Sequence, residues 1–269
     1  AASSRWRLTD ARKWSLDMTN NPQQSVKAAM LAIGDELLSG RTKDKNIGHL
    51  ADVLTAAGID LKEVRIVPDE AMAIIAALNA LRPHYDYVFT SGGIGPTHDD
   101  ITADAVSAAF NVPCVYDEKA MELLADNYAK RGLEFTDSRK RMARMPQGSE
   151  HIANPISAAP GFHIGNVYVM AGVPSVFQAM LDNVLPTLKT GRKLISRSVL
   201  CPFGEGVIGT LLTEIQKENP DTIIGSYPKF ENGRFSTELV VRGSDPGKID
   251  MAIDAIEKMI LSLETEGAA

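Results

Sequence analysis

The chain has 269 residues, of which 44% are hydrophobic and 23% charged, and its formal net charge is -6. This composition is ordinary for a soluble globular protein, and the length predicts about two domains. The absence of a long basic run argues against nucleic acid as a partner, and the lack of a long apolar stretch argues against a membrane-spanning helix. Cys114 and Cys201 form no CxxC pattern, which disfavours structural zinc and fits a reducing cytoplasm.

Residues 1–25 are polar and lack the apolar segment of a secretory signal. Met18 is a candidate translation start, in which case the residues before it are an extension. We expect residues 1–25 to be a disordered tail and the protein to be cytoplasmic.

Strands and helices alternate from residue 26 to about residue 131. Apolar periodicity predicts strands at 26–33, 59–67, 85–90 and 112–116. It predicts helices at about 47–57, 69–82, 101–110 and 117–131, the last one capped by Asp117. This alternation indicates a parallel sheet covered by helices and joined by right-handed crossovers.

The second half of the chain predicts the end of one domain and a smaller domain after it. Residues 132–150 are basic and irregular, with a short helix expected around 138–145; a strand follows at 167–170 and a helix begins at Pro174. A boundary is expected at Gly191-Arg192-Lys193. The order beyond it is strand 194–200, helix 205–217, strands 222–226 and 235–242, and helix 246–263. The predicted domains are therefore 26–190 and 191–269, the second a small α+β (βαββα) unit.

The most informative segment is Ser91-Gly92-Gly93-Ile94-Gly95-Pro96-Thr97-His98-Asp99-Asp100-Ile101-Thr102, which follows a strand and precedes a helix. Glycines let the backbone approach a ligand, a helix N-terminus favours anions, and ligands gather at the carboxyl ends of parallel strands. Helix capping offers another interpretation, because Thr97 and Asp100 have capping-box spacing and Asp99 is a possible N-cap. Capping accounts for one or two of these residues, but not for three glycines, a proline and two aspartates together.

Two carboxylates beside a phosphate site would repel the ligand. A divalent cation resolves this conflict by bridging carboxylate and phosphate oxygens, and Mg²⁺, Mn²⁺ or Co²⁺ suits such oxygen ligands. The sequence therefore predicts a metal-assisted phosphate site.

A second segment, Gly34-Asp35-Glu36-Leu37-Leu38-Ser39-Gly40-Arg41-Thr42, follows the first strand. It is not a P-loop, since its spacer is one residue too long and Arg41 replaces the lysine; a GxGxxG fingerprint is also missing. We interpret Asp44 as a helix cap, and Asp35 as functional because it directly follows a buried strand.

Three further segments have ordinary interpretations. Residues 154–162 and 172–175 are Gly/Pro turns, although the second precedes a helix and could offer amides to a ligand. The basic stretch with Arg139, Lys140, Arg141 and Arg144 is usually a solvated helix face, and less commonly holds a phosphate or closes over a site.

Taken together, the segments 34–40, 92–102, 154–161 and 172–175 resemble the molybdopterin-binding (MoaB/Mog-like) domain family, in the same order along the chain. The branch most similar is the N-terminal domain of the competence/damage-inducible protein CinA, and the string GGxGPTxDDxT at 92–102 is specific. The resemblance spans about 26–190, and the βαββα segment is also similar.

The resemblance implies a three-layer α/β fold with a mostly parallel sheet, and a homo-oligomer, either a dimer or a trimer. It implies three possible functions: a metal-dependent pyrophosphatase (a hydrolase) acting on ADP-ribose- or FAD-like dinucleotides, a molybdopterin-binding or molybdopterin-adenylylating protein, or a non-catalytic ligand-binding scaffold. We favour the pyrophosphatase. One position departs from the pattern, because Val176 stands where CinA-like sequences usually have an acid.

The residues expected to act fall into two groups. The predicted catalytic and metal-binding residues are Asp35, Asp99 and Asp100. The residues predicted to bind the nucleotide or molybdopterin-like small molecule are Ser91, Gly92, Gly93, Gly95, Thr97, Thr102, Gly161, Gly172, Pro174 and Ser175.

Overall fold

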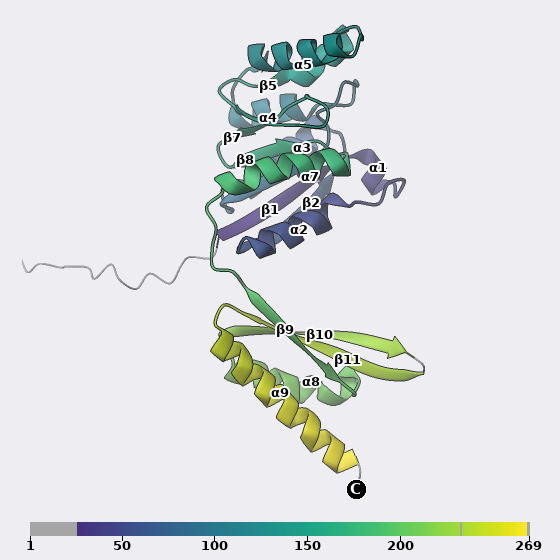
Figure 1. Cartoon of the computed structure of the whole chain (residues 1–269), viewed down its shortest axis with the longest axis vertical. Coiled ribbons are helices and arrows are strands. Elements are labelled where there is room, and N and C mark those ends of the chain that lie inside the picture. Colours follow the sequence, from purple (N-terminus) through teal and green to yellow (C-terminus); the bar gives the residue numbers. More distant parts are fainter. Residues whose placement is uncertain (1–25, 232, 268–269) are drawn as a thin grey trace, which may run out of the picture.

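A computed structural model describes residues 26–231 and 233–267, so the predicted tail at 1–25 lies outside the described residues. The chain forms a larger α/β unit followed by a smaller α+β unit (Figure 1). Among the described residues, no helix combines the length and the apolar character needed to cross a membrane.

The larger unit is built on a six-stranded sheet of order β2-β1-β3-β8-β7-β6. Its strands are β1 (Val26–Ile33), β2 (Ile59–Val67), β3 (Tyr87–Ser91), β6 (Glu150–Ile152), β7 (Gly161–Ile164) and β8 (Val167–Met170). The first four in the spatial order are parallel, whereas β7 and β6 extend the sheet antiparallel to β8. The mostly parallel sheet predicted from the sequence is confirmed, and the carboxyl ends of β1, β2, β3 and β8 meet at one edge.

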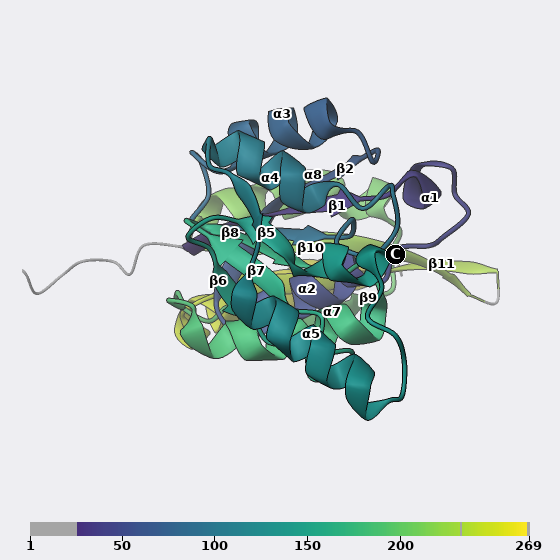
Figure 2. The same ribbon diagram turned by 90° about the horizontal axis from the view of Figure 1, so that it is seen from above.

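Helices cover both faces of this sheet, which makes the unit three-layered. One layer contains α2 (Asn46–Ala56) and α7 (Pro174–Val184), and the other contains α3 (Ala71–Leu81) and α4 (Thr102–Phe110). In Figure 2, α3 and α4 lie on one side of β1, and α2 and α7 lie on the other.

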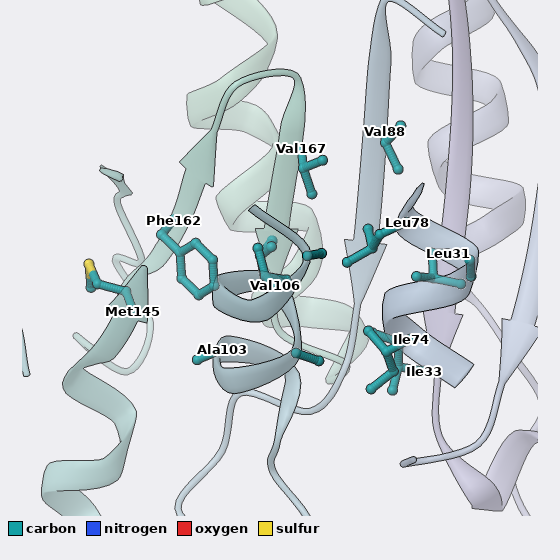
Figure 3. Packing of buried hydrophobic residues seen from close by; sticks show 14 of the residues in the cluster. Leu31, Ile33, Ile74, Leu78, Val88, Ala103, Val106, Met145, Phe162 and Val167 are labelled. Atoms are coloured by element: carbon teal, nitrogen blue, oxygen red, sulfur yellow. The ribbon is translucent and has the colours of Figure 1, made fainter. Parts of the chain in front are cut away.

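The alternation of side chains along β1 explains the two layers. Met30 points into the cluster with α2 and α7, whereas Leu31 points into the cluster with α3 and α4. Both side chains are fully buried, and burial of each contributes about 1.5–3 kcal/mol. Figure 3 shows the cluster that contains Leu31, in which Leu78 of α3 and Val106 of α4 face the strands.

An annex beside α4 carries residues 114–146. It consists of β4 (Cys114–Tyr116), α5 (Glu118–Lys130), the single turn α6 (Asp137–Lys140), the 3-10 turn η1 (Arg141–Ala143) and β5 (Arg144–Pro146). Asp117 caps α5 as predicted, accepting a hydrogen bond from the amide of Ala120 (2.9 Å).

The short helix expected around 138–145 differs from the observed structure. The chain is helical through Ala143, first as α6 and then as the 3-10 turn η1, and becomes extended at Arg144, because β5 pairs with β4 and places Pro146 opposite Cys114. Pro146 cannot continue a helix, and the buried Met145 packs into the core from the strand.

The smaller unit has the predicted βαββα order. It comprises β9 (Ile195–Cys201), α8 (Glu205–Glu218), β10 (Thr222–Glu231), β11 (Arg234–Gly243) and α9 (Pro246–Gly267). The strands form an antiparallel sheet of order β10-β11-β9, and Leu239 and Val241 pack against Ile256 of α9. Strand β10 is longer than expected because its second half pairs with β11 as far as Glu231.

Candidate functional site

A cleft of about 480 Å³ lies at the carboxyl edge of the parallel strands. Its walls come from the segments that follow β1, β2, β3 and β8, with further residues from 142–159. They include Gly34, Glu36, Thr42, Asp69, Gly92, Gly93, Ile94, Gly95, Asp99, Asp100, Met142, Asn154, Ser157, Gly172, Val173, Pro174 and Val176. All four segments that carry the family resemblance therefore contribute residues to this cleft, together with Asp69. The segment 154–161 contributes Asn154 and Ser157.

The glycines after β3 are required by the backbone itself. Gly92 has φ +108°, and a Cβ added there would lie 2.2 Å from the carbonyl oxygen of Ile33. Gly93 has φ +68°, and its Cβ would lie 2.1 Å from the hydroxyl of Thr102. L-residues disfavour such φ values, so only glycine fits at both positions. The loop therefore presents bare backbone to the cleft.

Asp100 closes the loop. Its Oδ2 accepts hydrogen bonds from the amide of Thr97 (2.8 Å) and from the Thr97 hydroxyl (2.6 Å). Helix α4 begins only at Thr102, and within the described residues no side chain hydrogen-bonds to its cap. Neither aspartate caps α4, although the bond from the Thr97 amide to Asp100 is one half of the capping box that the spacing suggested; both aspartates line the cleft.

Asp69, which follows β2, was not among the residues predicted for the site. It lines the cleft, and its Oδ2 accepts a hydrogen bond from the amide of Asp35 (2.9 Å). Burial raises the pKa of Asp69; that amide counteracts the rise, and the negative charges of Asp35, Glu36 and Asp99 add to it. The sequence did carry a signal for Asp69, because it follows the predicted strand 59–67 just as Asp35 follows the predicted strand 26–33.

Asp35 itself has an exposed side chain and is not among the described residues that line the cleft. It is the first residue of the one-turn helix α1 (Asp35–Leu38), and it contacts the site through its amide. Glu36 lines the cleft instead, and its Oε2 lies 2.5 Å from where a Cβ on Gly34 would stand. The carboxylate of Glu36 therefore folds back over Gly34.

The other predicted residues divide into three groups. Gly172 and Pro174 line the cleft. Thr102 and Ser91 are buried behind it: the Thr102 hydroxyl donates to the Gly92 carbonyl (3.1 Å), and the Ser91 hydroxyl accepts from Asn46 (2.7 Å).

Thr97, Ser175 and Gly161 lie outside the lining described above. Thr97 holds Asp100, and Ser175 is exposed on α7. Gly161 is buried in β7, where a Cβ would lie 2.4 Å from the carbonyl oxygen of Val169. This glycine lets β7 approach β8, so its role in the structure is packing within the sheet.

The basic stretch braces the glycine-rich loop, so it is more than a solvated face. Ser138 donates to the carbonyl of Pro96 (3.1 Å), and Arg141 donates to the carbonyl of Asp100 (3.2 Å). Arg144 forms an ion pair with Asp104 of α4. These contacts hold the annex against the loop.

Four carboxylates line the cleft, from Glu36, Asp69, Asp99 and Asp100. Among the described residues, no three histidine, cysteine, aspartate or glutamate side chains are grouped closely enough to hold a metal ion by themselves. The predicted trio of Asp35, Asp99 and Asp100 is therefore not assembled as a complete ligand set. A cation here would need further ligand oxygens, from water or a bound phosphate.

The family comparisons match both units of the chain. Residues 29–190 match the family described as "probable molybdopterin binding domain". Residues 193–265 match the family described as "FAD synthase, middle domain".

Two archaeal proteins match this chain over most of their own length. A protein of Thermococcus kodakarensis is 33% identical over 88% of this chain and 98% of its own length. A protein of Archaeoglobus fulgidus is 30% identical over 86% of this chain and 96% of its own length.

One solved structure supports both the fold and the resemblance to CinA. The protein CinA of Thermoplasma acidophilum, described as having unknown function, is 29% identical with a TM-score of 0.56 over 61% of this chain and 98% of its own. Since the larger unit matches over more than half of the chain and carries the family's loops around one cleft, this protein belongs to the molybdopterin-binding, MoaB/Mog-like domain family.

Proposed function

We propose that the cleft binds the diphosphate of a dinucleotide and catalyses its hydrolysis with the help of a divalent cation. The observation that carries the proposal is that bare glycine backbone and four carboxylates line the same hollow. The glycine loop and the start of α4 suit an anion, and the carboxylates repel one. A cation between them reconciles the two features.

The donor chemistry fits a hard cation. Magnesium sites in nucleotide enzymes often use one or two carboxylates and complete the shell with substrate phosphates and water. Asp69 and Asp99 are the best candidates, because both line the cleft and the charge of Asp99 contributes to the raised pKa of Asp69. When bound, the cation would neutralise charge that develops on the phosphoryl oxygens.

The chain's own residues would do the remaining work. Gly92, Gly93 and Gly95 let the diphosphate approach the backbone. Asp100 keeps the loop closed through Thr97 and lies where it could accept a proton from the attacking water. Water adds to one phosphorus, the bridging P–O bond breaks, and two monophosphates leave.

The smaller unit supports a flavin dinucleotide as substrate, since residues 193–265 match a domain of FAD synthase. The family resemblance adds ADP-ribose as a second compound to test. The two share a diphosphate between hydroxylated carbon chains or rings, which is the feature that the cleft would recognise.

The direct test is an endpoint assay with FAD, ADP-ribose and NAD, with and without Mg²⁺, Mn²⁺ or Co²⁺. We expect cation-dependent release of monophosphates by the wild type and their loss in Asp100→Ala. Asp126→Ala, at an exposed site on α5, is the matched control and should retain full activity. Absence of cleavage of all three compounds under every condition would reject hydrolysis.

A second candidate function is binding of molybdopterin without hydrolysis. The match of residues 29–190 to the family described as "probable molybdopterin binding domain" favours it. Val176, a buried apolar side chain on the cleft wall where CinA-like sequences usually have an acid, argues against catalysis. Saturable binding of a pterin monophosphate, together with inert dinucleotides, would support this function instead.

A further inference from the structure

Asn46 ties together two of the loops that form the cleft. It is the first residue of α2, and only 3% of it is exposed. Its Nδ2 donates to the Ser91 hydroxyl (2.7 Å) and to the Gly172 carbonyl (2.8 Å). Asn46 thus joins the end of β3 to the segment after β8.

These contacts fix which way the amide points. The carbonyl of Gly172 can only accept a hydrogen bond, so the Asn46 nitrogen must face it. A flipped amide would place two oxygens against each other. The Oδ1 atom is therefore directed away from both partners, and it accepts no hydrogen bond from any described residue although it is buried.

A small side pocket of about 50 Å³ lies beside Asn46. Asn46, Ser91, Lys43 and Lys45 contribute to its walls. Five of its lining residues also line the main cleft, so the two hollows share a wall: Ile33, Glu36, Thr42, Gly172 and Pro174. Its volume suits a single small polar group and is too small for a ring.

We propose that Asn46 is a specificity-determining residue that accepts a hydrogen bond, through Oδ1, from a hydroxyl group of the sugar or sugar alcohol next to the ligand's diphosphate. An enclosed acceptor requires a donor, and a buried acceptor without one is unfavourable. This inference rests on the proposed function, because it assumes that the diphosphate occupies the adjoining cleft. It adds the part of the ligand that the site distinguishes.

The test compares three ligands by calorimetric titration in the presence of Mg²⁺, each as its methylene-bridged analogue so that hydrolysis cannot interfere: inorganic pyrophosphate, ADP and ADP-ribose. Pyrophosphate reports on the diphosphate site alone, and the other two add one and two sugars. We expect the wild type to bind at least one sugar-bearing ligand more tightly than pyrophosphate. In Asn46→Ala this advantage should fall by about tenfold, the usual effect of losing one such hydrogen bond.

Asn46→Asp separates recognition from loop positioning. Its carboxylate still accepts a hydrogen bond, but it has lost the donor to Gly172 and carries a negative charge. Both effects should weaken pyrophosphate and ADP-ribose alike, leaving their affinity ratio as in the wild type. This variant also keeps the comparison possible if the alanine variant fails to fold.

Equal weakening of pyrophosphate and ADP-ribose in Asn46→Ala would overturn the inference, because Asn46 would then only hold the loops or bind a water. Equal binding of all three ligands by the wild type would overturn it as well. Failure of the wild type to cleave native ADP-ribose in the endpoint assay would reject the proposed hydrolysis, while the affinity ratios from the titration would still decide the role of Asn46.

Discussion

Replacing Gly92 with alanine tests whether the glycine loop is built by close backbone contact. The new Cβ would stand 2.2 Å from the carbonyl oxygen of Ile33, at the buried end of β1. That oxygen belongs to backbone and cannot rotate away. The backbone at residue 92 must also keep φ +108°, which an L-residue disfavours.

The expected loss of unfolding free energy combines two terms. Holding a non-glycine residue at positive φ costs about 1–2 kcal/mol, and shifting packed strand ends adds about 1–3 kcal/mol. We therefore expect about 3 kcal/mol for Gly92→Ala. Gly148 is the matched control, since it has φ +82° but nothing within 4 Å of an added Cβ, so Gly148→Ala should cost about 1 kcal/mol.

Urea unfolding followed by far-ultraviolet circular dichroism measures both variants. Gly92→Ala should also weaken pyrophosphate binding, whereas Gly148→Ala should not. If Gly92→Ala were no less stable than Gly148→Ala, the account of the loop would be refuted.

Three further predictions concern charged side chains of the larger unit. Asp69→Asn should leave the cation-free protein at least as stable as the wild type in thermal unfolding, because asparagine still accepts a hydrogen bond from the Asp35 amide and carries no charge. Cation-dependent binding of pyrophosphate should be lost. A clear drop in the melting temperature would contradict this prediction. Arg144→Gln breaks the part-buried ion pair with Asp104 and should lower the free energy of unfolding in urea by about 1–2 kcal/mol. Adding Asp104→Asn to this variant should cost nothing more, and additive losses would show that the two side chains are not coupled. Burial raises the pKa of Asp117, but hydrogen bonds from Ala120 and His151 outweigh this effect, so the pKa is lowered overall. The stabilisation by Asp117 is therefore present above about pH 4 and is lost as the pH falls through the lowered pKa. Asp117→Asn should make the free energy of unfolding fall less steeply at acid pH, and an unchanged fall would contradict the assignment.

Much of the fold was predictable because periodic patterns are local. The alternation of strands and helices through residue 116, the Asp117 cap and the βαββα unit all follow from apolar spacing and capping residues. The short strands β6 (EHI) and β7 (GFHI) were missed because they mix polar and apolar residues, whereas the equally short β8 (VYVM) is a continuous apolar run. Their place is set by pairing between strands, β7 with β8 and β6 with β7, and no local pattern encodes these contacts.

The site was predictable where glycines force the backbone, and less so where side-chain direction decides. Gly92, Gly93 and Gly95 line the cleft as expected. Asp35 and Glu36 are neighbours in sequence, and only the one-turn helix after Gly34 determines that Glu36 faces inward. Asp69 was interpreted as part of a helix start, and its place in the cleft depends on the pairing of β2 with β1.

The central claim is that a diphosphate binds in this cleft together with a divalent cation. Calorimetric titration of a non-hydrolysable, methylene-bridged analogue of ADP-ribose into the wild-type protein, once with Mg²⁺ and once with a chelator, tests it most directly. The account predicts saturable binding with Mg²⁺ and a large loss of affinity without it. Equal affinity under both conditions, or no binding under either, would contradict it.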